Sequence, residues 1–476
     1  MKLTILTIRN LTTTPIELKS ISRSDEANVP FVSRCCGGSI FAKRKTYTSD
    51  QHDSNSGRFS KNSEVLSIPI EPFESKTTNI EILPNELVRY TFRADGKLYQ
   101  VENVRGRSSH SVALNCLSPT PHSKFTAIFH PEFAHLAIFT TTTREAWMSE
   151  LEDDLPLSAL SIPGTHNSAT CYTAFPSVRC QAVDVKTQLQ NGIRFLDIRV
   201  QPEKPLDASK DHLILVHSAF PVSLTGNKYL RDIIKVLDAF LDVNPSETVI
   251  LSIKREGVGK STDEQLCKIL HDHYARDRSR WFTENRIPTL GEVRKKIVLV
   301  RRFCLDNSLK GENMGNGWGI DAEFWPDNCV DGSCAGGNIR IQDFYELSAA
   351  EIIHLKIRYS IEQLIRSAQS IFDLNSVASE IPKQPFFVNF LSASNFWSTS
   401  CWPERVAAKV NPQIVAHLCL NHHRDESSDP SLSGESKKEY MGNGSTGIVV
   451  CDWAGKNGNW DLINCIIGMN ARLQMI

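Results

Sequence analysis

The sequence lacks any run of about 18 apolar residues, which is the length that a membrane-spanning helix needs. It also lacks the pattern of a secretory leader, because Thr4, Thr7 and Arg9 interrupt the apolar residues near the N-terminus. The alternation in that segment, MKLTILTIRN, predicts a β-strand instead. We therefore expect a cytoplasmic chain that begins to fold at its first residues.

A strong net charge is also missing, since 53 Lys and Arg residues face 54 Asp and Glu residues and leave a formal charge of −1. This balance gives the surface no general attraction for nucleic acid or for anionic lipid. We expect no nucleic-acid partner, and no feature of the sequence predicts an obligatory protein partner. Any site for an anion must be built locally.

The 13 cysteines include no CxxC pair, so the paired spacing of a structural zinc site is absent. We predict neither a metal nor another cofactor. Scattered thiols with apolar neighbours are typical of a reducing compartment, where cysteine serves as a small core residue. The pair best placed for a disulfide is Cys329 and Cys334, which flank a glycine-bearing loop.

Residues 1–140 differ in pattern from the rest of the chain, whose length itself suggests two domains. Short alternating runs such as LTILTI, VLSIPI and RYTFRA are separated by polar turn clusters. They predict an antiparallel, sandwich-like β domain. This domain carries no chemical motif, so its role stays undefined beyond packing or targeting.

Residues 145–476 alternate apolar runs with amphipathic segments. Runs such as GIRFLDIRV, LILVHS, ETVILSIKRE and KIVLVRRF predict buried strands, and YLRDIIKVLDAFLDVN has Leu, Ile and Val at helical spacing. Repeated strand–helix alternation predicts an α/β fold with a parallel sheet closed as a TIM-type (β/α) barrel.

The ends of the predicted strands are unusually rich in polar residues. In a β/α barrel the reacting groups lie at the carboxyl ends of the strands, so these residues are expected to meet at one rim. A single strand-end histidine or aspartate is more often a solvated or capping residue, and only the combination indicates a site. The combination comprises His166, Asp197, Arg199, His217, Lys254, Glu256, Arg302, Asp343, Tyr345 and Asp452.

Two histidines and an arginine supply what the transfer of a phosphodiester to a neighbouring hydroxyl requires. Of His166 and His217, one imidazole removes the proton of the nucleophile and the other protonates the leaving oxygen. The guanidinium of Arg199 can bind two phosphoryl oxygens as negative charge develops. A carboxylate such as Asp452 behind one imidazole fixes its tautomer.

Several blocks of the sequence resemble the bacterial-type phosphatidylinositol-specific phospholipases C, which are PLC-like phosphodiesterases with an X domain. The blocks are SIPGTHNS, GIRFLDIR, VHS, NPSETVILSIKRE, KIVLVRRF, FWPDN, IQDFY and the last strand with Asp452, and they follow the family's order over residues 145–470. The resemblance implies a distorted barrel. It also implies metal-independent cleavage of phosphatidylinositol to diacylglycerol and inositol 1,2-cyclic phosphate.

The resemblance assigns the family's catalytic roles to residues of this chain. His166 corresponds to the general base that deprotonates the inositol 2-hydroxyl, and His217 to the general acid that protonates the leaving oxygen. Arg199 corresponds to the phosphate-binding arginine. Asp452 corresponds to the carboxylate paired with the base, and Asp197, on the strand of Arg199, is expected to support that site.

The resemblance also implies contacts with the substrate, which is phosphatidylinositol in a membrane. Lys254, Arg302 and Asp343 fall on positions that contact the inositol hydroxyls. Tyr345 falls on the position whose ring stacks on the sugar. Glu256 is expected only to orient Lys254.

Asn167 departs from the family pattern, because bacterial members carry Asp directly after the catalytic His. The calcium-dependent eukaryotic enzymes carry Asn there as a metal ligand, but they have an acidic residue where this chain has Arg199. A guanidinium in that position repels calcium, so we expect a metal-independent site. We expect Asn167 to orient Arg199 through its side-chain carbonyl, and the missing carboxylate to give a slower enzyme.

A substrate in a bilayer predicts apolar anchors on the rim and a peripheral contact with the membrane. Phe396, Trp397 and Trp402 follow the seventh strand, in the loop that inserts into lipid in the bacterial enzymes. The alternative is that they pack on the neighbouring helix. The family's other membrane-contacting Trp has no counterpart in CYTAFPSVRCQAVD, which predicts weaker membrane affinity or a contribution from the N-terminal domain.

Three alternatives stay open. The same fold can act on another phosphodiester, such as glycosylphosphatidylinositol. A catalytically weak protein that binds inositol lipids is favoured only by Asn167. A metal-dependent glycerophosphodiester phosphodiesterase needs acidic metal ligands at the first two strand ends, where this chain has Arg199.

Overall fold

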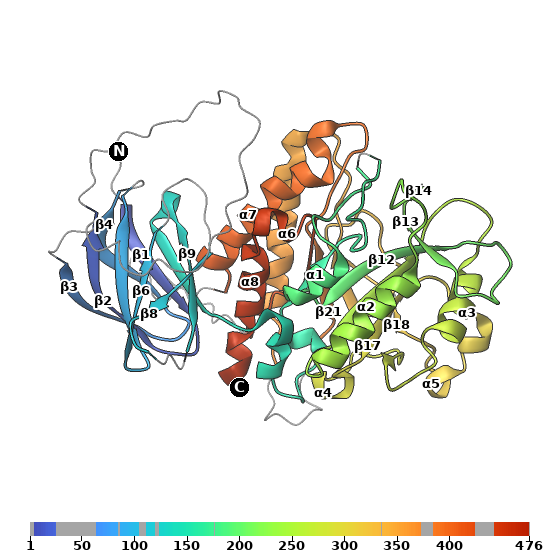
Figure 1. Ribbon diagram of the computed structural model, residues 1–476, viewed down its shortest axis with the longest axis horizontal. Helices are drawn as coiled ribbons and strands as arrows, with labels where there is room; N and C mark the ends of the chain where they lie inside the picture. Colours follow the sequence, from blue (N-terminus) through green and yellow to red (C-terminus); the bar gives the residue numbers. More distant parts are fainter. Residues whose placement is uncertain are drawn as a thin grey trace, which may run out of the picture. The chain divides into compact units, whose positions relative to one another are not determined.

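A computed structural model describes residues 4–24, 63–83, 86–103, 111–119, 123–175, 177–334, 336–372, 384–423 and 442–475. The chain divides into two compact units, each described by itself below (Figure 1). The first contains Met1–Asn10 and Thr14–Ile138, and the second contains Leu11–Thr13 and Phe139–Ile476. Within the described ranges, every helix is too short or too polar to cross a membrane.

The first unit consists of two five-stranded β-sheets around a shared hydrophobic core. One sheet has the order β4-β1-β10-β9-β7 and the other has the order β3-β2-β5-β6-β8. Leu6 and Ile8 of one sheet meet Leu18 and Phe92 of the other in this core. Alternate residues of β4 are buried, as a half-buried strand requires. The strands are β1 (Thr4–Leu11), β2 (Ile16–Arg23), β3 (Glu64–Ile70), β4 (Ser75–Ile82), β5 (Val88–Ala94), β6 (Lys97–Glu102), β7 (Ser111–Ala113), β8 (Asn115–Cys116), β9 (Phe125–His130) and β10 (His135–Thr140).

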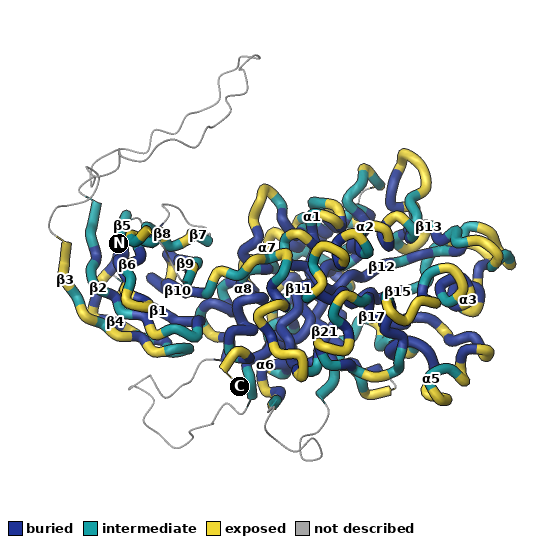
Figure 2. The backbone as a smooth tube through the Cα atoms, turned by 60° about the horizontal axis from the view of Figure 1, so that its bottom comes forward, coloured by how far each residue is buried: buried dark blue, intermediate teal, exposed yellow. Residues whose placement is uncertain are grey.

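The second unit is built on a parallel sheet with the order β17-β15-β12-β11-β22-β21-β20. Every neighbouring pair on this path runs parallel. The strands are almost wholly buried, which explains their unbroken apolar runs (Figure 2). They are β11 (Ile162–Thr165), β12 (Phe195–Pro202), β15 (Val249–Arg255), β17 (Ile297–Arg302), β20 (Ile339–Gln342), β21 (Phe386–Phe390) and β22 (Ile448–Cys451).

One strand of this sheet was predicted wrongly, and closure of the sheet is not confirmed. The run LILVHS is no parallel strand, because β13 (Leu213–His217) pairs antiparallel with β12 and forms a hairpin with β14 (Phe220–Pro221). The predicted distorted barrel is not confirmed, since no ladder joins β20 to β17 in the described ranges. The remaining short strands are β16 (Trp281–Phe282) and β18 (Ile320–Asp321) beside β17, and β19 (Gly332–Ser333) beside β20.

Helices connect the parallel strands. In α2 (Leu230–Val243) the buried residues Leu230, Ile233, Leu237 and Leu241 recur at the helical spacing that the sequence predicts. The connections gather the carboxyl ends of the parallel strands at one edge of the sheet, where the candidate site lies. The other helices are α1 (Val185–Gln190), α3 (Asp263–His273), α4 (Leu290–Val293), α5 (Glu312–Gly315), α6 (Ile353–Ala368), α7 (Pro403–Leu420) and α8 (Asp461–Gly468).

Candidate active site

His166 and Asp452 follow two strands that are paired with each other. β11 and β22 run parallel with Thr165 opposite Cys451, so the next residues emerge side by side. The Nδ1–H of His166 donates to Oδ1 of Asp452 across 2.8 Å. This bond assigns the proton of the neutral ring to Nδ1. Nε2 is therefore the atom of His166 that can accept a proton.

His217 reaches the site from the β13–β14 hairpin, not from the parallel sheet. Its ring is perpendicular to that of His166, with 6.0 Å between the ring centroids. Its Nδ1–H donates to the carbonyl of Val178 at 2.8 Å, which leaves Nε2 as the nitrogen that exchanges protons. Burial, together with the charges of Arg199 and His166, lowers the pKa of His217 to about 4. His217 is therefore neutral at pH 7 in the free protein.

Arg199 is held between two carboxylates. Its Nε and Nη2 donate to Oδ2 of Asp197 at 3.3 and 3.2 Å, and its Nη1 donates to Oε1 of Glu256 at 2.8 Å. Burial pushes the pKa of Asp197 upward, but Arg199 and Arg302 outweigh it and hold that pKa well below its usual range. Burial is likewise outweighed at Glu256, whose pKa Arg199 and Lys254 lower to about 2. Both carboxylates stay charged at neutral pH and fix the guanidinium.

Glu256 does more than the predicted orientation of Lys254. Its Oε1 accepts from Nζ of Lys254 at 3.0 Å in addition to Arg199, and its Oε2 accepts from the backbone N–H of Ser218 at 2.8 Å. Ser218 directly follows His217. One carboxylate therefore ties the end of β15 to the hairpin that carries the second histidine.

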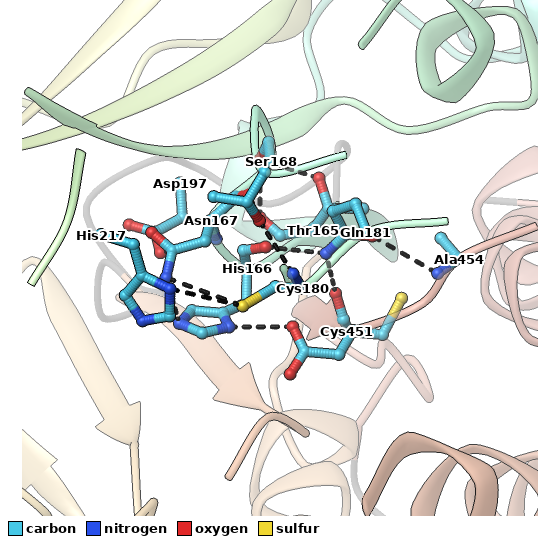
Figure 3. A network of polar contacts seen from close by, with 12 residues as sticks. Thr165, His166, Asn167, Ser168, Cys180, Gln181, Asp197, His217, Cys451 and Ala454 are labelled. Carbon is cyan, nitrogen blue, oxygen red and sulfur yellow. Dashed lines mark hydrogen bonds and ion pairs between the residues drawn. The ribbon is translucent and has the colours of Figure 1, made fainter. Parts of the chain in front are cut away.

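Asn167 has a left-handed backbone, with φ of 43°, which asparagine tolerates better than most residues. Its Nδ2–H donates to Nε2 of His166 at 3.1 Å, and its backbone N–H donates to Oδ2 of Asp197 at 3.1 Å (Figure 3). The predicted contact of its carbonyl with Arg199 is wrong, because Oδ1 is buried without a hydrogen-bond partner among the described residues. Its connection to Arg199 runs through the backbone and Asp197.

Cys180 lies beside the two histidines, although no sequence pattern pointed to it. Its Sγ is 3.8 Å from Nδ1 of His217 and 4.0 Å from Nδ2 of Asn167 (Figure 3). Burial raises the pKa of the thiol well above its usual range, so the sulfur is protonated at neutral pH. The next residue, Gln181, donates to the backbone carbonyl of His166 at 2.7 Å and holds the segment against the end of β11.

Two of the predicted headgroup residues are open to solvent and two are buried. Lys254 is accessible, with 39% of its side chain exposed. Tyr345 is half-buried, and its hydroxyl donates to Oδ1 of Asp327 at 2.9 Å. Arg302 and Asp343 are buried. The open pair can therefore meet a ligand directly, whereas the buried pair is tied into the protein.

Trp325 joins the two buried residues. Its ring centroid lies 3.7 Å from Cζ of Arg302, and its Nε1–H donates to Oδ2 of Asp343 at 2.9 Å. Arg302 also donates from Nη1 to Oδ1 of Asp197 at 3.2 Å, while its Nε is buried and unpaired in the described structure. Arg302 thus supports the carboxylate that holds Arg199.

Four aromatic rings, here called the rim aromatics, form a series of contacts: Phe175, Phe220, Phe396 and Trp397. Phe396 stacks on Phe220 with 5.9 Å between centroids and 3° between planes. Phe175 contacts Phe220 at 5.6 Å, and Trp397 contacts Phe396 at 5.0 Å. Phe396 is 42% exposed and Trp397 is 90% exposed. Trp402 is half-buried and donates from Nε1 to the carbonyl of Phe396 at 3.2 Å. This bond holds the backbone of the loop that carries Phe396.

A fully buried lysine lies behind the strand ends. Lys356 of α6 donates from Nζ to Oε1 of Gln342 at 3.0 Å. Burial lowers the pKa of Lys356 to about 7, although Asp343 and Asp452 act in the opposite direction. Gln342 continues the network by donating to Oδ1 of Asn389 at 2.8 Å.

Comparison with known proteins identifies the family. The family model described as "Phosphatidylinositol-specific phospholipase C, X domain" matches residues 154–303. A 1-phosphatidylinositol phosphodiesterase of Listeria monocytogenes is 34% identical over 286 residues, which cover 58% of this chain and 76% of the Listeria protein. The chain belongs to the bacterial-type phosphatidylinositol-specific phospholipase C family.

Other members of the phospholipase C family match over more of the chain. A 1-phosphatidylinositol phosphodiesterase of Staphylococcus aureus (strain Newman) is 27% identical over 360 residues, covering 71% of this chain and 97% of that protein. The crystal structure of a pentafluoro-Phe variant of the S. aureus phosphatidylinositol-specific phospholipase C has a TM-score of 0.51 at 23% identity, covering 69% of this chain and 97% of that one. The structural likeness shows the shared fold, and the family membership confirms the resemblance seen in the sequence.

In this member of the phospholipase C family, four residues of the site escaped the sequence prediction: Phe175, Cys180, Phe220 and Trp325. Trp325 belongs to the block FWPDN, so the resemblance itself contained the signal for it. The other three lie in the segment after β11 or in the hairpin. No strand-end position marks them in the sequence.

Cys329 and Cys334, the pair best placed for a disulfide, are both free thiols. The Sγ of Cys329 contacts the carbonyl of Ile341 at 3.5 Å, and Cys334 is buried. The cysteines in the described ranges all remain as thiols.

Proposed function

We propose that the protein is a metal-independent phosphatidylinositol-specific phospholipase C that forms diacylglycerol and inositol 1,2-cyclic phosphate. The observation that carries the proposal is the pair of perpendicular imidazoles, His166 and His217, 6.0 Å apart beside a fixed guanidinium. Relatives named 1-phosphatidylinositol phosphodiesterase support the same substrate for this chain.

His166 acts as the general base. Its Nε2 takes the proton of the inositol 2-hydroxyl as that oxygen attacks phosphorus, and Asp452 stabilises the resulting imidazolium through Nδ1–H. Asn167 donates to the same Nε2, so its amide must give way before the hydroxyl can approach. This competition is the structural reason to expect a slow turnover.

His217 acts as the general acid and protonates the diacylglycerol oxygen from Nε2 as the phosphorus–oxygen bond breaks. In the free protein this imidazole is neutral at pH 7, because its pKa is about 4. The negative charge of a bound phosphate favours the protonated ring and raises this pKa. Substrate binding thereby helps to prepare the acid.

Arg199 takes the place that a metal would need. Its planar donors are suited to two phosphoryl oxygens as charge builds on them. Asp197 and Glu256, the acidic groups on which a hard cation would depend, are already bonded to this guanidinium. The same occupation argues against a metal-dependent glycerophosphodiester phosphodiesterase.

The headgroup contacts follow from the accessible side chains. Lys254 and Tyr345 meet the inositol ring directly, while Arg302 and Asp343 support the pocket from its buried floor, where Arg302 donates to Asp197 and Asp343 accepts from Trp325. This set suits an inositol headgroup, whether it belongs to phosphatidylinositol or to glycosylphosphatidylinositol. A catalytically weak protein that binds inositol lipids is the second candidate, favoured by the contact of Asn167 with Nε2 of His166.

The rim aromatics contact the membrane in this proposal. Rings that are exposed and apolar partition into the lipid interface. Phe175 lies in the segment where the family's second membrane-contacting Trp is missing, so it supplies a ring from that side. Peripheral attachment through these loops brings the carboxyl ends of the parallel strands, where the site lies, to the lipid headgroups.

The test is an incubation with phosphatidylinositol vesicles in EDTA, followed by phosphorus NMR of inositol 1,2-cyclic phosphate. We expect His166→Ala and His217→Ala each to lower the rate by at least about 10²-fold. Asp452→Asn should lower kcat with little change in KM, and Asp331→Asn, at an ion pair with Arg340, serves as the matched control.

Two outcomes contradict the proposal. Product that forms only after calcium is added refutes metal independence. Lipid binding without any product under either condition favours the binding-protein alternative.

A further inference from the structure

We propose that the thiol of Cys180 and the imidazoles of His166 and His217 form a binding site for a soft divalent metal ion of the Zn²⁺ or Cd²⁺ type, and that the bound ion inhibits catalysis. One sulfur and one nitrogen from each ring lie within 4.8 Å of one another (Figure 3). The three residues are far apart in the sequence, so cysteine spacing did not reveal the group. The inhibition rests on the proposed function, whereas the metal binding does not.

The distances require only small side-chain rotations. Zinc–sulfur bonds of about 2.3 Å and zinc–nitrogen bonds of about 2.0 Å place tetrahedral donors roughly 3.5 Å apart. Sγ of Cys180 and Nδ1 of His217 are already 3.8 Å apart. A metal at this nitrogen replaces its hydrogen bond with the carbonyl of Val178.

His166 is arranged as metal-binding histidines commonly are. Its Nδ1–H is held by the carboxylate of Asp452, and such a carboxylate is a frequent outer partner of a metal-bound imidazole. The bond fixes the ring and leaves Nε2 as the donor to the metal. An ion on Nε2 removes the lone pair that the general base needs, which is why occupancy stops the reaction.

The side-chain oxygen of Asn167 gives a second, independent indication of a ligand. Its Oδ1 is buried and has no hydrogen-bond partner in the part of the chain that the structure describes. Its Nδ2 lies 3.1 Å from Nε2 of His166 and 4.0 Å from Sγ of Cys180. A half-turn of the amide exchanges the two atoms, which brings the oxygen beside those donors and moves the nitrogen to the position that the oxygen leaves. The oxygen then gains a partner, and the metal gains a fourth ligand.

The donor set determines which ions bind. Sulfur and imidazole favour Zn²⁺ and Cd²⁺, whereas Ca²⁺ and Mg²⁺ prefer oxygen ligands. Binding breaks the S–H bond of Cys180, forms a metal–sulfur bond and releases one proton to solvent, while the ring proton of His217 moves from Nδ1 to Nε2. The positive charge of Arg199 disfavours any metal nearby, but Asp197 and Glu256 balance it.

Binding is tested without reference to activity by ¹¹³Cd NMR of the full-length protein after removal of metals with a chelator. We expect a bound signal typical of a mixed sulfur–nitrogen site in the wild type and in Cys171→Ser, a control in the same segment. The signal should disappear in Cys180→Ser and in His217→Asn, which change different donors. Its absence from the wild type, or its persistence in either folded donor variant, overturns the proposal.

Inhibition is measured separately on phosphatidylinositol vesicles with Zn²⁺. We expect Zn²⁺ to stop cleavage by the wild type and Cys171→Ser, EDTA to restore it, and the inhibition constant to rise by at least about tenfold in Cys180→Ala. Equal inhibition of Cys180→Ala overturns the inhibitory role. A protein that binds Cd²⁺ through Cys180 but cleaves no phosphatidylinositol refutes the proposed function and leaves the metal site intact.

Discussion

Asn167 donates its side-chain amide to Nε2 of His166 across 3.1 Å, and this nitrogen is the one that a general base must keep free. On the other side of the ring, Asp452 holds Nδ1–H. The imidazole is therefore fixed from both sides in the free protein, with its basic lone pair engaged by a neutral donor.

Replacing Asn167 by Asp should raise the turnover of phosphatidylinositol several-fold. A carboxylate offers no N–H to Nε2, and its negative charge favours the protonated form of the nearby His217. The left-handed φ of 43° is acceptable to Asp. Initial rates on vesicles in EDTA provide the measurement.

Asn167→Gly is the matched control, because glycine accepts the same backbone without strain and removes the amide without adding charge. If Gly and Asp raise the rate equally, the effect comes from freeing Nε2. If both lower the rate, Asn167 assists the reaction and the interpretation of the contact is wrong.

The titration of His217 gives a direct test of the acid. We expect an NMR midpoint of about 4 in the free protein, because burial and the charge of Arg199 oppose protonation. Arg199→Gln should raise the midpoint, and an inositol phosphate ligand should raise it in the wild type. Above the midpoint, the protonated fraction of His217 falls tenfold per pH unit. Because kcat/KM reports the protonation state of the free enzyme, kcat/KM should fall with this fraction. A midpoint near 6.5 that is the same in the wild type and in Arg199→Gln contradicts this arrangement.

Removing the rim aromatics should weaken attachment to vesicles more than it slows the chemistry. Trp397→Ala and Phe175→Ala are each expected to reduce vesicle partition about tenfold, or about 1.4 kcal/mol. The rate on a water-soluble inositol phosphodiester should change little. Phe133→Ala, at a 53% exposed ring of the first unit, is the control. An equal loss in that variant would assign membrane contact to the first unit.

Lys356→Met should raise the free energy of unfolding at pH 7. The pKa of Lys356 is about 7 in the folded protein and 10.5 for a solvated lysine, as in the unfolded chain. Between these two pH values, only the unfolded chain holds the proton. The free energy of unfolding therefore rises with pH across this window, by up to about 1.4 kcal/mol per unit. Met removes this slope, while Oε1 of Gln342 keeps the backbone N–H of Phe344 as a donor.

Urea unfolding at pH 7, 8 and 9 measures the effect of Lys356→Met. The control is Lys268→Met on α3, whose side chain is 52% exposed. A wild-type stability that is flat over this range shows that Lys356 keeps its proton when folded.

The sequence predicted the parallel strands well because buried strands need continuous apolar runs, and β12, β15 and β17 have them. The same rule misassigned β13, since LILVH has an equally apolar run. Pairing direction depends on the connection, and residues 203–212 are too few for a parallel crossover, which needs roughly a dozen residues. The short connection therefore predicts that β13 pairs antiparallel with β12.

The candidate site divides in the same way. Residues at strand ends, such as His166 and Asp452, were predictable because parallel strands bring their carboxyl ends together. Cys180 and Phe175 come from the segment after β11, whose path depends on contacts that no periodicity records. Val178 belongs to that segment as well, and its carbonyl fixes the tautomer of His217.

The β13–β14 hairpin pairs Phe220 with His217, and Glu256 anchors the residue after His217 to β15. The ring that stacks on Phe396 and the imidazole that we propose as the proton donor thus belong to paired residues of one short hairpin. If the rim aromatics contact lipid as proposed, a displacement of the Phe220 ring would reach His217 through one pair of hairpin residues. Membrane docking through these loops would then act directly on the position of the proposed proton donor.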